Sequence, residues 1–151
     1  MTDVRLEPMT EGQYKPWRAE AEAHYARSVV ASGQSAQDAA RTAADTYARL
    51  LPDEFATPDQ HFWYAYDGDR RVGLLWIKVT HDTAFVYDVA VEPDVRRRGY
   101  GRAIMLAAER WCHDNALRRI GLHVFAHNTG ARALYEQLGF TETGRNMAKD
   151  L

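Results

Sequence analysis

The residues best suited to chemistry gather in a short turn between an apolar run and an amphipathic segment. This turn is Arg96-Arg97-Arg98-Gly99-Tyr100-Gly101-Arg102, and it combines four arginines with two glycines. Glycines permit a tight turn whose backbone N–H groups point the same way, and the positive end of the following helix dipole adds to them. The turn therefore predicts a binding site for a phosphate or pyrophosphate, whereas a solvated basic turn is the alternative.

The same turn departs from the commoner nucleotide-binding loops. A Walker A loop places Lys and then Ser or Thr after its second glycine, whereas Arg102-Ala103 follow here. A dinucleotide-binding fingerprint needs three glycines, and this turn has two. Nucleic-acid binding is disfavoured as well, because the chain has a net charge of −2 and no evident aromatic stacking platform.

The elements that must position this turn follow from the hydrophobic periodicity. The run from Ala84 to Val91 is typical of a strand buried on both faces, and helical periodicity begins at Gly101. Thr10 and Gln13 predict a capping box for an earlier helix, with Pro16 in its first turn. The remaining expected elements are strands at 4–9, 61–67, 71–79, 120–125 and 140–147, and helices from Ser35 to Leu51 and from Asn128 to Gly139. The predicted order is β-α-α-β-β-β-α-β-α-β, an α/β (α+β) fold with a mixed, mainly antiparallel sheet and helices on both faces.

Composition bounds the class of protein. The length of 151 residues fits one domain, and 46% hydrophobic with 26% charged residues is typical of a globular chain. One cysteine, Cys112, cannot form an internal disulfide, which favours a reducing compartment such as the cytoplasm. No apolar run is long enough to span a bilayer, so we expect no membrane partner. His123 and His127 straddle a strand end, so no metal site is expected.

Two motifs together resemble the GNAT family of acetyl-CoA-dependent N-acetyltransferases. The first is Arg-x-x-Gly-x-Gly at residues 96–101 after a buried strand, and the second is Asn128, Ala131, Tyr135-Glu136 and Gly139-Phe140. The match is specific over residues 85–140 and looser over residues 1–80, where only the order of elements agrees. The resemblance extends to small bacterial members of the family, and it implies one N-acetyltransferase domain over residues 1–151. Residues 1–80 would form its acceptor-side half and residues 84–140 its acetyl-CoA-binding core.

The resemblance also implies roles for individual residues. The strand segment Val89-Ala90-Val91 would hold the pantetheine arm of acetyl-CoA, with backbone groups of Val89 and Val91 pairing with it as with an added strand. The turn would hold the pyrophosphate through the amides from Arg97 to Arg102, with Arg96 beside them. Asn128 and Ala131 would border the pantetheine and its thiol end. Tyr135 would protonate the leaving thiolate, a role that suits a phenol with a pKa of about 10.

The sequence leaves the identity of the general base open. Histone-type relatives use a glutamate on the central strand, but aligning the arginine motif puts Phe85 at that place. Asp88 is the favoured candidate because a carboxylate in an apolar run is either paired or functional. Other possible proton carriers are Glu20, His24, Tyr25, His61 and His123.

Neither the amine acceptor, which could be a small molecule or a protein, nor the assembly follows from the sequence. Dimers are common in the family, which makes a homodimer one expected assembly. A non-catalytic acyl-CoA-binding or sensing module is the alternative function.

Overall fold

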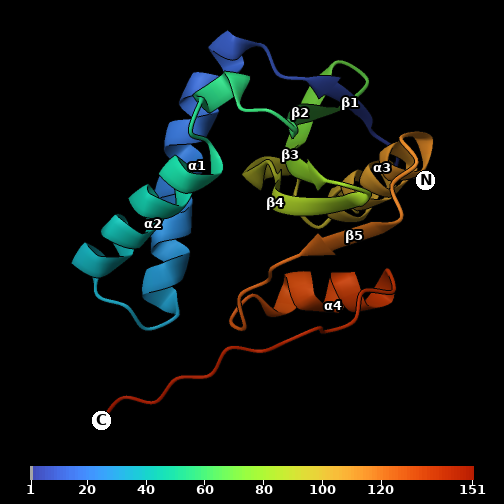
Figure 1. The fold of residues 1–151 in the computed structure, drawn as a ribbon. Helices are drawn as coiled ribbons and strands as arrows, with labels where there is room; N and C mark the ends of the chain where they lie inside the picture. Colours follow the sequence, from blue (N-terminus) through green and yellow to red (C-terminus); the bar gives the residue numbers. More distant parts are fainter. Residues whose placement is uncertain (1) are drawn as a thin grey trace.

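A computed structural model of the protein describes residues 2–151. Five strands form one sheet in the order β1-β2-β3-β4-β5, in which the first four strands are antiparallel and β5 pairs with β4 in parallel (Figure 1). The strands are β1 (Arg5–Pro8), β2 (Gln60–Asp67), β3 (Arg70–Thr80), β4 (Thr83–Val91) and β5 (Arg119–Leu122). The helices are α1 (Glu11–Ala31), α2 (Ala36–Leu50), α3 (Tyr100–Asp114) and α4 (Thr129–Gln137), with short 3-10 turns at Glu54–Ala56 and Pro93–Val95.

Different helices cover the two faces of the sheet. On one face α3 buries its apolar side, including Ile104 and Met105, against Leu75, Ile77 and Val86 of the strands. On the other face α1 and α2 pack through an aromatic cluster formed by Tyr14, Trp17, Tyr47, Phe62 and Trp76. The mixed sheet with helices on both faces, as predicted from the sequence, is thereby confirmed.

The helix α1 begins where the sequence indicates and differs in one detail. The Thr10 hydroxyl accepts a hydrogen bond from the Gln13 N–H, and the Gln13 side chain accepts one from the Thr10 N–H, which completes the capping box. Pro16, however, is the sixth residue of this 21-residue helix rather than part of its first turn. Proline there removes the hydrogen bond that an N–H would donate to the carbonyl of Gly12.

A β-bulge in β4 changes which face its side chains occupy. Trp76 pairs with Asp88 and Ile77 pairs with Val86, so Tyr87 is the extra residue. Before the bulge Ala84 and Val86 face α3; after it Val89 and Val91 do so, and Asp88 is shifted to the face of α1 and α2. Only Ala84 and Val86 of β4 are fully buried. The expectation of a strand buried on both faces was therefore wrong, because helices do not cover all of the α1/α2 face.

The carboxyl-terminal part differs most from the sequence prediction. β5 ends at Leu122, so β4 and β5 pair only over Thr83–Val86 and Arg119–Leu122. The predicted final strand at 140–147 is absent from the described chain, since residues 140–151 run as an extended, mainly exposed tail beyond α4 (Figure 1). Phe140 is anchored by its N–H to the Tyr135 carbonyl at 2.9 Å. Beyond it Glu142 pairs with Arg145 of the tail and with Arg132 of α4 rather than with a strand.

In residues 2–151 no helix is both long and apolar enough to cross a membrane.

Candidate active site

The arginine-rich turn presents unpaired backbone N–H groups. Arg97 and Gly99 have positive φ values of 64° and 85°, which fold the chain tightly just before α3. The first helical hydrogen bond is donated by Ala103 to the Gly99 carbonyl at 3.1 Å, so the N–H groups from Gly99 to Arg102 precede the internal ladder. No side chain caps this end of α3. These donors and the helix dipole form a site suited to an anion.

The turn's arginines are free of carboxylate partners. Among residues 2–151 none of the arginines from Arg96 to Arg102 forms an ion pair, and Arg96 instead donates from Nε to the Val91 carbonyl at 3.2 Å. The two carboxylates just before the turn are engaged by other cations, in the pairs Arg71–Glu92 and Arg70–Asp94. The positive charge of the turn is therefore available to a ligand.

The open edge of β4 leads to this turn. Glu92 donates its N–H to the Val72 carbonyl at 2.8 Å, and the Ala90 carbonyl faces Gly73, where a Cβ would lie 2.3 Å from the oxygen. Backbone groups alternate in direction along a strand, so those of Val89 and Val91 face away from β3. On that side β5 has already diverged from β4. The edge is open to an extended ligand.

Asp88 lies among aromatic side chains on the α1/α2 face. Burial raises its pKa to about 6, an effect that the Trp17 indole N–H and the Val89 backbone N–H partly offset. The Trp17 Nε1–H is itself buried and meets no acceptor with full hydrogen-bond geometry among the described residues, so its dipole acts on the carboxylate from nearby. A carboxylate with a pKa near 6 is mostly ionised at neutral pH and can accept a proton there.

Tyr135 reaches the same region from α4. Burial raises the pKa of its phenol, and the negative charge of Asp88 raises it further, so the two predicted catalytic side chains are electrostatically coupled. Tyr135 packs edge-on against Phe140 with ring centroids 5.7 Å apart. The Asn128 side chain caps α4 by accepting from the Ala131 N–H at 3.3 Å, as the sequence predicted.

Two other suggested proton carriers, His61 and Glu20, are held in structural contacts. His61 stacks on Trp63 and contacts Trp111, with centroids 5.6 and 4.9 Å apart, and burial lowers its pKa. Glu20 pairs with Arg27 at 3.2 Å, and His24 is exposed. Within residues 2–151 no three His, Cys, Asp or Glu side chains are grouped to hold a metal ion.

The sequence pattern does not reveal the aromatic surroundings of Asp88. Trp17 on α1 and Tyr47 on α2 both belong to the aromatic cluster on this face. Burial raises the pKa of Tyr47 and the charge of Asp88 raises it further, which places α2 beside the carboxylate. No local motif marks these residues, and only the tyrosine and tryptophan content of the two helices hints at them.

Comparison with known proteins identifies the class. Residues 17–140 match the family model described as acetyltransferase (GNAT) family, and the chain belongs to this family. It is 33% identical to the Uncharacterized N-acetyltransferase YycN of Bacillus subtilis (strain 168), over 98% of this chain and 99% of that protein. The crystal structure of YycN superposes with a TM-score of 0.92 over 98% of each chain.

Two further relatives are more distant. The Uncharacterized N-acetyltransferase YdgE of Bacillus subtilis (strain 168) is 26% identical over 97% of each chain. The PaiA N-acetyltransferase of Thermoplasma acidophilum, solved in complex with coenzyme A, shares the fold with a TM-score of 0.68 at 16% identity over 93% of this chain and 91% of that one. The protein is therefore an acyltransferase of the N-acetyltransferase type.

Proposed function

We propose that this protein transfers the acetyl group of acetyl-CoA directly to an amine, without a covalent enzyme intermediate. The observation that carries the proposal is the open edge of β4, which runs straight into the unpaired N–H groups at the start of α3. An extended arm can pair with the edge while a pyrophosphate sits on the amides. The coenzyme A bound to the PaiA enzyme of the same fold supports this choice of donor.

The donor contacts are assigned to the turn and the strand. Val89, Ala90 and Val91 would line the pantetheine arm, and the arm would displace the Arg96 side chain from the Val91 carbonyl. The segment from Arg96 to Arg102 would hold the pyrophosphate. Asn128 and Ala131, at the start of α4, would border the thiol end. In this proposal residues 84–140 form the donor half and residues 1–80 the acceptor half.

The acid–base roles fall to Asp88 and Tyr135. An amine with a pKa of about 10.4 is protonated at neutral pH and must lose a proton before its nitrogen can attack the acetyl carbonyl. Asp88 would accept that proton, directly or through water. When the C–N bond has formed and the C–S bond breaks, the thiolate of coenzyme A would receive the Tyr135 hydroxyl proton. Because its pKa is raised, Tyr135 keeps this proton at neutral pH.

The test is coenzyme A release with a panel of amines, beside calorimetric binding of acetyl-CoA. Tyr135→Phe is expected to lower kcat about 100-fold with little change in acetyl-CoA affinity, because only the donated proton is lost. Tyr66→Phe makes the same chemical change on β2, where Tyr66 lies under Arg5, and serves as the matched control.

Full turnover by Tyr135→Phe would remove the phenol from the mechanism. Binding of acetyl-CoA without turnover of any amine would instead favour the acyl-CoA-binding module. Absence of acetyl-CoA binding would overturn the donor assignment.

A further inference from the structure

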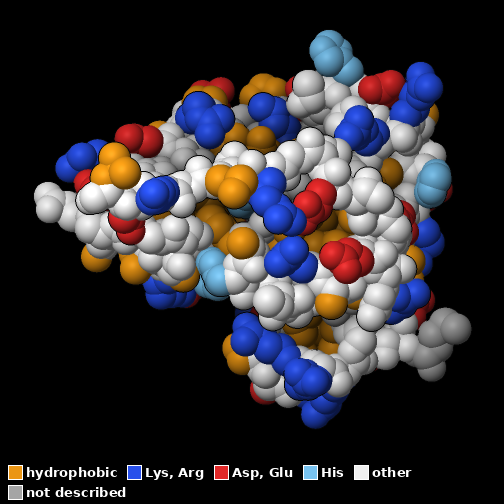
Figure 2. All heavy atoms as spheres, turned by 90° about the horizontal axis from the view of Figure 1, so that it is seen from below, with side chains coloured by type: hydrophobic (Ala, Val, Ile, Leu, Met, Phe, Trp, Pro, Cys, Tyr) orange, Lys and Arg blue, Asp and Glu red, His pale blue; other side chains and the backbone are white. Residues whose placement is uncertain are grey.

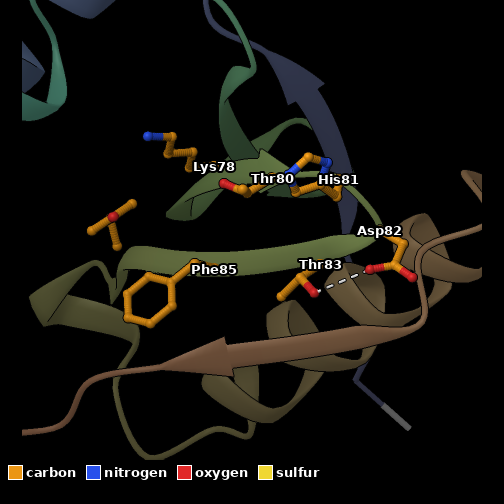
Figure 3. A pocket seen from close by; sticks show the side chains of 7 residues that line it. Lys78, Thr80, His81, Asp82, Thr83 and Phe85 are labelled. Carbon is orange, nitrogen blue, oxygen red and sulfur yellow. Dashed lines mark hydrogen bonds between the residues drawn. The ribbon is translucent and has the colours of Figure 1, made fainter.

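A hollow lies on the α1/α2 face of the sheet, and its lining residues come from the strands and their turn rather than from either helix. It has a volume of about 390 Å³ and is formed at the hairpin end of β3 and β4, with Lys78, Thr80, Thr83, Phe85 and Tyr87 among its lining residues. Figure 3 shows Lys78 and Phe85 extending the same way from adjacent strands, while His81 and Asp82 lie at the opposite end, at the turn. The donor site does not use these residues.

An aromatic floor connects this hollow with Asp88. The Phe85 ring lies 4.7 Å from that of Tyr87, which in turn lies 5.0 Å from Trp76. Trp76 is the strand partner of Asp88. On the β5 side the floor continues over Gly121, where an added Cβ would lie 3.5 Å from the Phe85 ring. A ligand that starts at Asp88 can therefore follow β4 into the hollow without crossing a polar barrier.

The charged groups around the hollow are mainly cationic. Lys78 is half-buried opposite Phe85, and Arg119 is the β5 partner of Thr83 on the same face. Neither cation forms an ion pair or a side-chain hydrogen bond within residues 2–151. The carboxylate of Asp82 lies 3.9 Å from Arg118, and one of its oxygens is 3.5 Å from the Thr83 hydroxyl.

A further cation, Arg49, lies on α2, and other Lys and Arg side chains are visible on a neighbouring face of the molecule. Arg49 lowers the otherwise raised pKa of Tyr87, so its guanidinium also faces the aromatic floor. Figure 2, which views the molecule from the side of α4 and the carboxyl-terminal tail, shows hydrophobic side chains in the hollows with Lys and Arg side chains, and some Asp and Glu side chains, around them. An apolar floor bordered by unpaired cations suits a ligand that is apolar in its middle and anionic at its end.

We propose that this hollow binds an anionic group of the amine acceptor, and that Lys78 and Arg119 determine this specificity. The inference rests on the proposed acetyl transfer and adds the class of acceptor. Phe85 and Thr83 pair with Lys78 and Thr80, which lie two and four residues along β3 from Trp76, the partner of Asp88. At about 3.3 Å per strand residue this places the anion about 7–13 Å from the acetylated nitrogen. The acceptor would be an amine with an apolar linker and a distal carboxylate or phosphate.

The test compares acceptors that differ only in their distal group. The probes are 8-aminooctanoate, its amide and 1,8-diaminooctane, with 12-aminododecanoate as a longer carboxylate and 8-aminooctyl phosphate as the phosphate arm. Coenzyme A release gives kcat/KM for each probe with the wild type, Lys78→Glu, Arg119→Glu and the control Lys149→Glu. The control makes the same charge change in the exposed tail, away from the hollow.

The wild type is expected to prefer a carboxylate or phosphate probe over the matched amide by about three- to tenfold, as for partly exposed ion pairs. Lys78→Glu and Arg119→Glu should each abolish or reverse this preference by raising KM, while Lys149→Glu retains it. Comparing the carboxylate with the phosphate identifies the anion.

The proposal would be overturned if the wild type used all probes equally. It would also be overturned if Lys78→Glu and Arg119→Glu both kept the wild-type preference for the anionic probe. Turnover of other amines with none of these probes accepted would overturn it as well, as would a Lys78→Glu effect confined to the oligomeric state in light scattering. Failure of every amine, with acetyl-CoA still bound, would point instead to failure of the proposed acetyl transfer.

Discussion

Replacing Asp88 by Asn should stabilise the folded protein at neutral pH while it removes catalysis. Burial raises the pKa of Asp88 from 3.8 to about 6, so the folded chain disfavours the ionised carboxylate. At about 1.4 kcal/mol per pKa unit, the ionised carboxylate destabilises the folded state by about 3 kcal/mol once the group is ionised in both the folded and the unfolded chain. Asparagine has nearly the same shape without the charge, so Asp88→Asn should recover most of that free energy.

The direction of the Asp88 pKa shift determines the pH range over which the stability difference changes. Below pH 3.8 Asp88 is protonated in the folded and the unfolded chain, and its ionisation makes no difference to stability. As the pH rises from 3.8 to about 6, the unfolded chain ionises first and the folded state loses stability. The free energy of unfolding of Asp88→Asn relative to wild type should therefore rise across this window and stay constant above it.

The assay is urea unfolding followed by tryptophan fluorescence at several values between about pH 4 and about pH 8, with the ionic strength held constant. Asp69→Asn, which changes an exposed carboxylate in the β2–β3 turn, is the control for the same substitution elsewhere. A stability difference that is the same at both ends of the pH range would refute the reasoning.

In parallel, coenzyme A release should fall at least about 100-fold in Asp88→Asn. Unchanged turnover would remove Asp88 as the base.

Three further predictions concern the backbone. Gly73→Ala would bring a Cβ to 2.3 Å from the Ala90 carbonyl, so urea unfolding should show a loss of about 2–3 kcal/mol; a loss near zero would contradict the close strand contact. Gly99→Ala must adopt a φ of 85°, which should cost about 1–2 kcal/mol and weaken acetyl-CoA binding in calorimetry; unaltered affinity would argue against the amide site. Thr10→Ala should lose about 1 kcal/mol in thermal unfolding, whereas Thr10→Ser should retain the cap; equal melting of both variants would exclude the capping box as the cause.

Local chemistry explains which parts of the fold could be predicted. The caps at Thr10, Ser35 and Asn128 are side-chain hydrogen bonds to N–H groups three residues onward, and sequence spacing reveals them. The turn before α3 is equally local, because Gly99 supplies the backbone conformation that starts the helix. The backbone shape of the arginine-rich turn was predictable for this reason.

The position of Asp88 could not be predicted in the same way. Strict alternation from Ala84 and Val86 would have put Asp88 beneath α3. The bulge at Tyr87 depends on how β3 and β4 pair, and nothing in the run of apolar residues marks it. The strand predicted at 140–147 was wrong for a different reason. A strand requires a neighbouring strand edge to pair with as well as a suitable sequence.

The short pairing between β4 and β5 has a mechanical consequence. Four residue pairs are the whole backbone ladder that joins β5, and the α4 segment after it, to the remaining sheet. Such a short β4–β5 pairing lets the segment from β5 onward open separately from global unfolding. Amide hydrogen exchange on β5 should then be faster than on β3. A ligand that contacts both β4 and β5 would make the segment from β5 onward unfold together with the rest of the sheet. Acetyl-CoA binding should therefore slow amide exchange in β5 and also sharpen the unfolding transition.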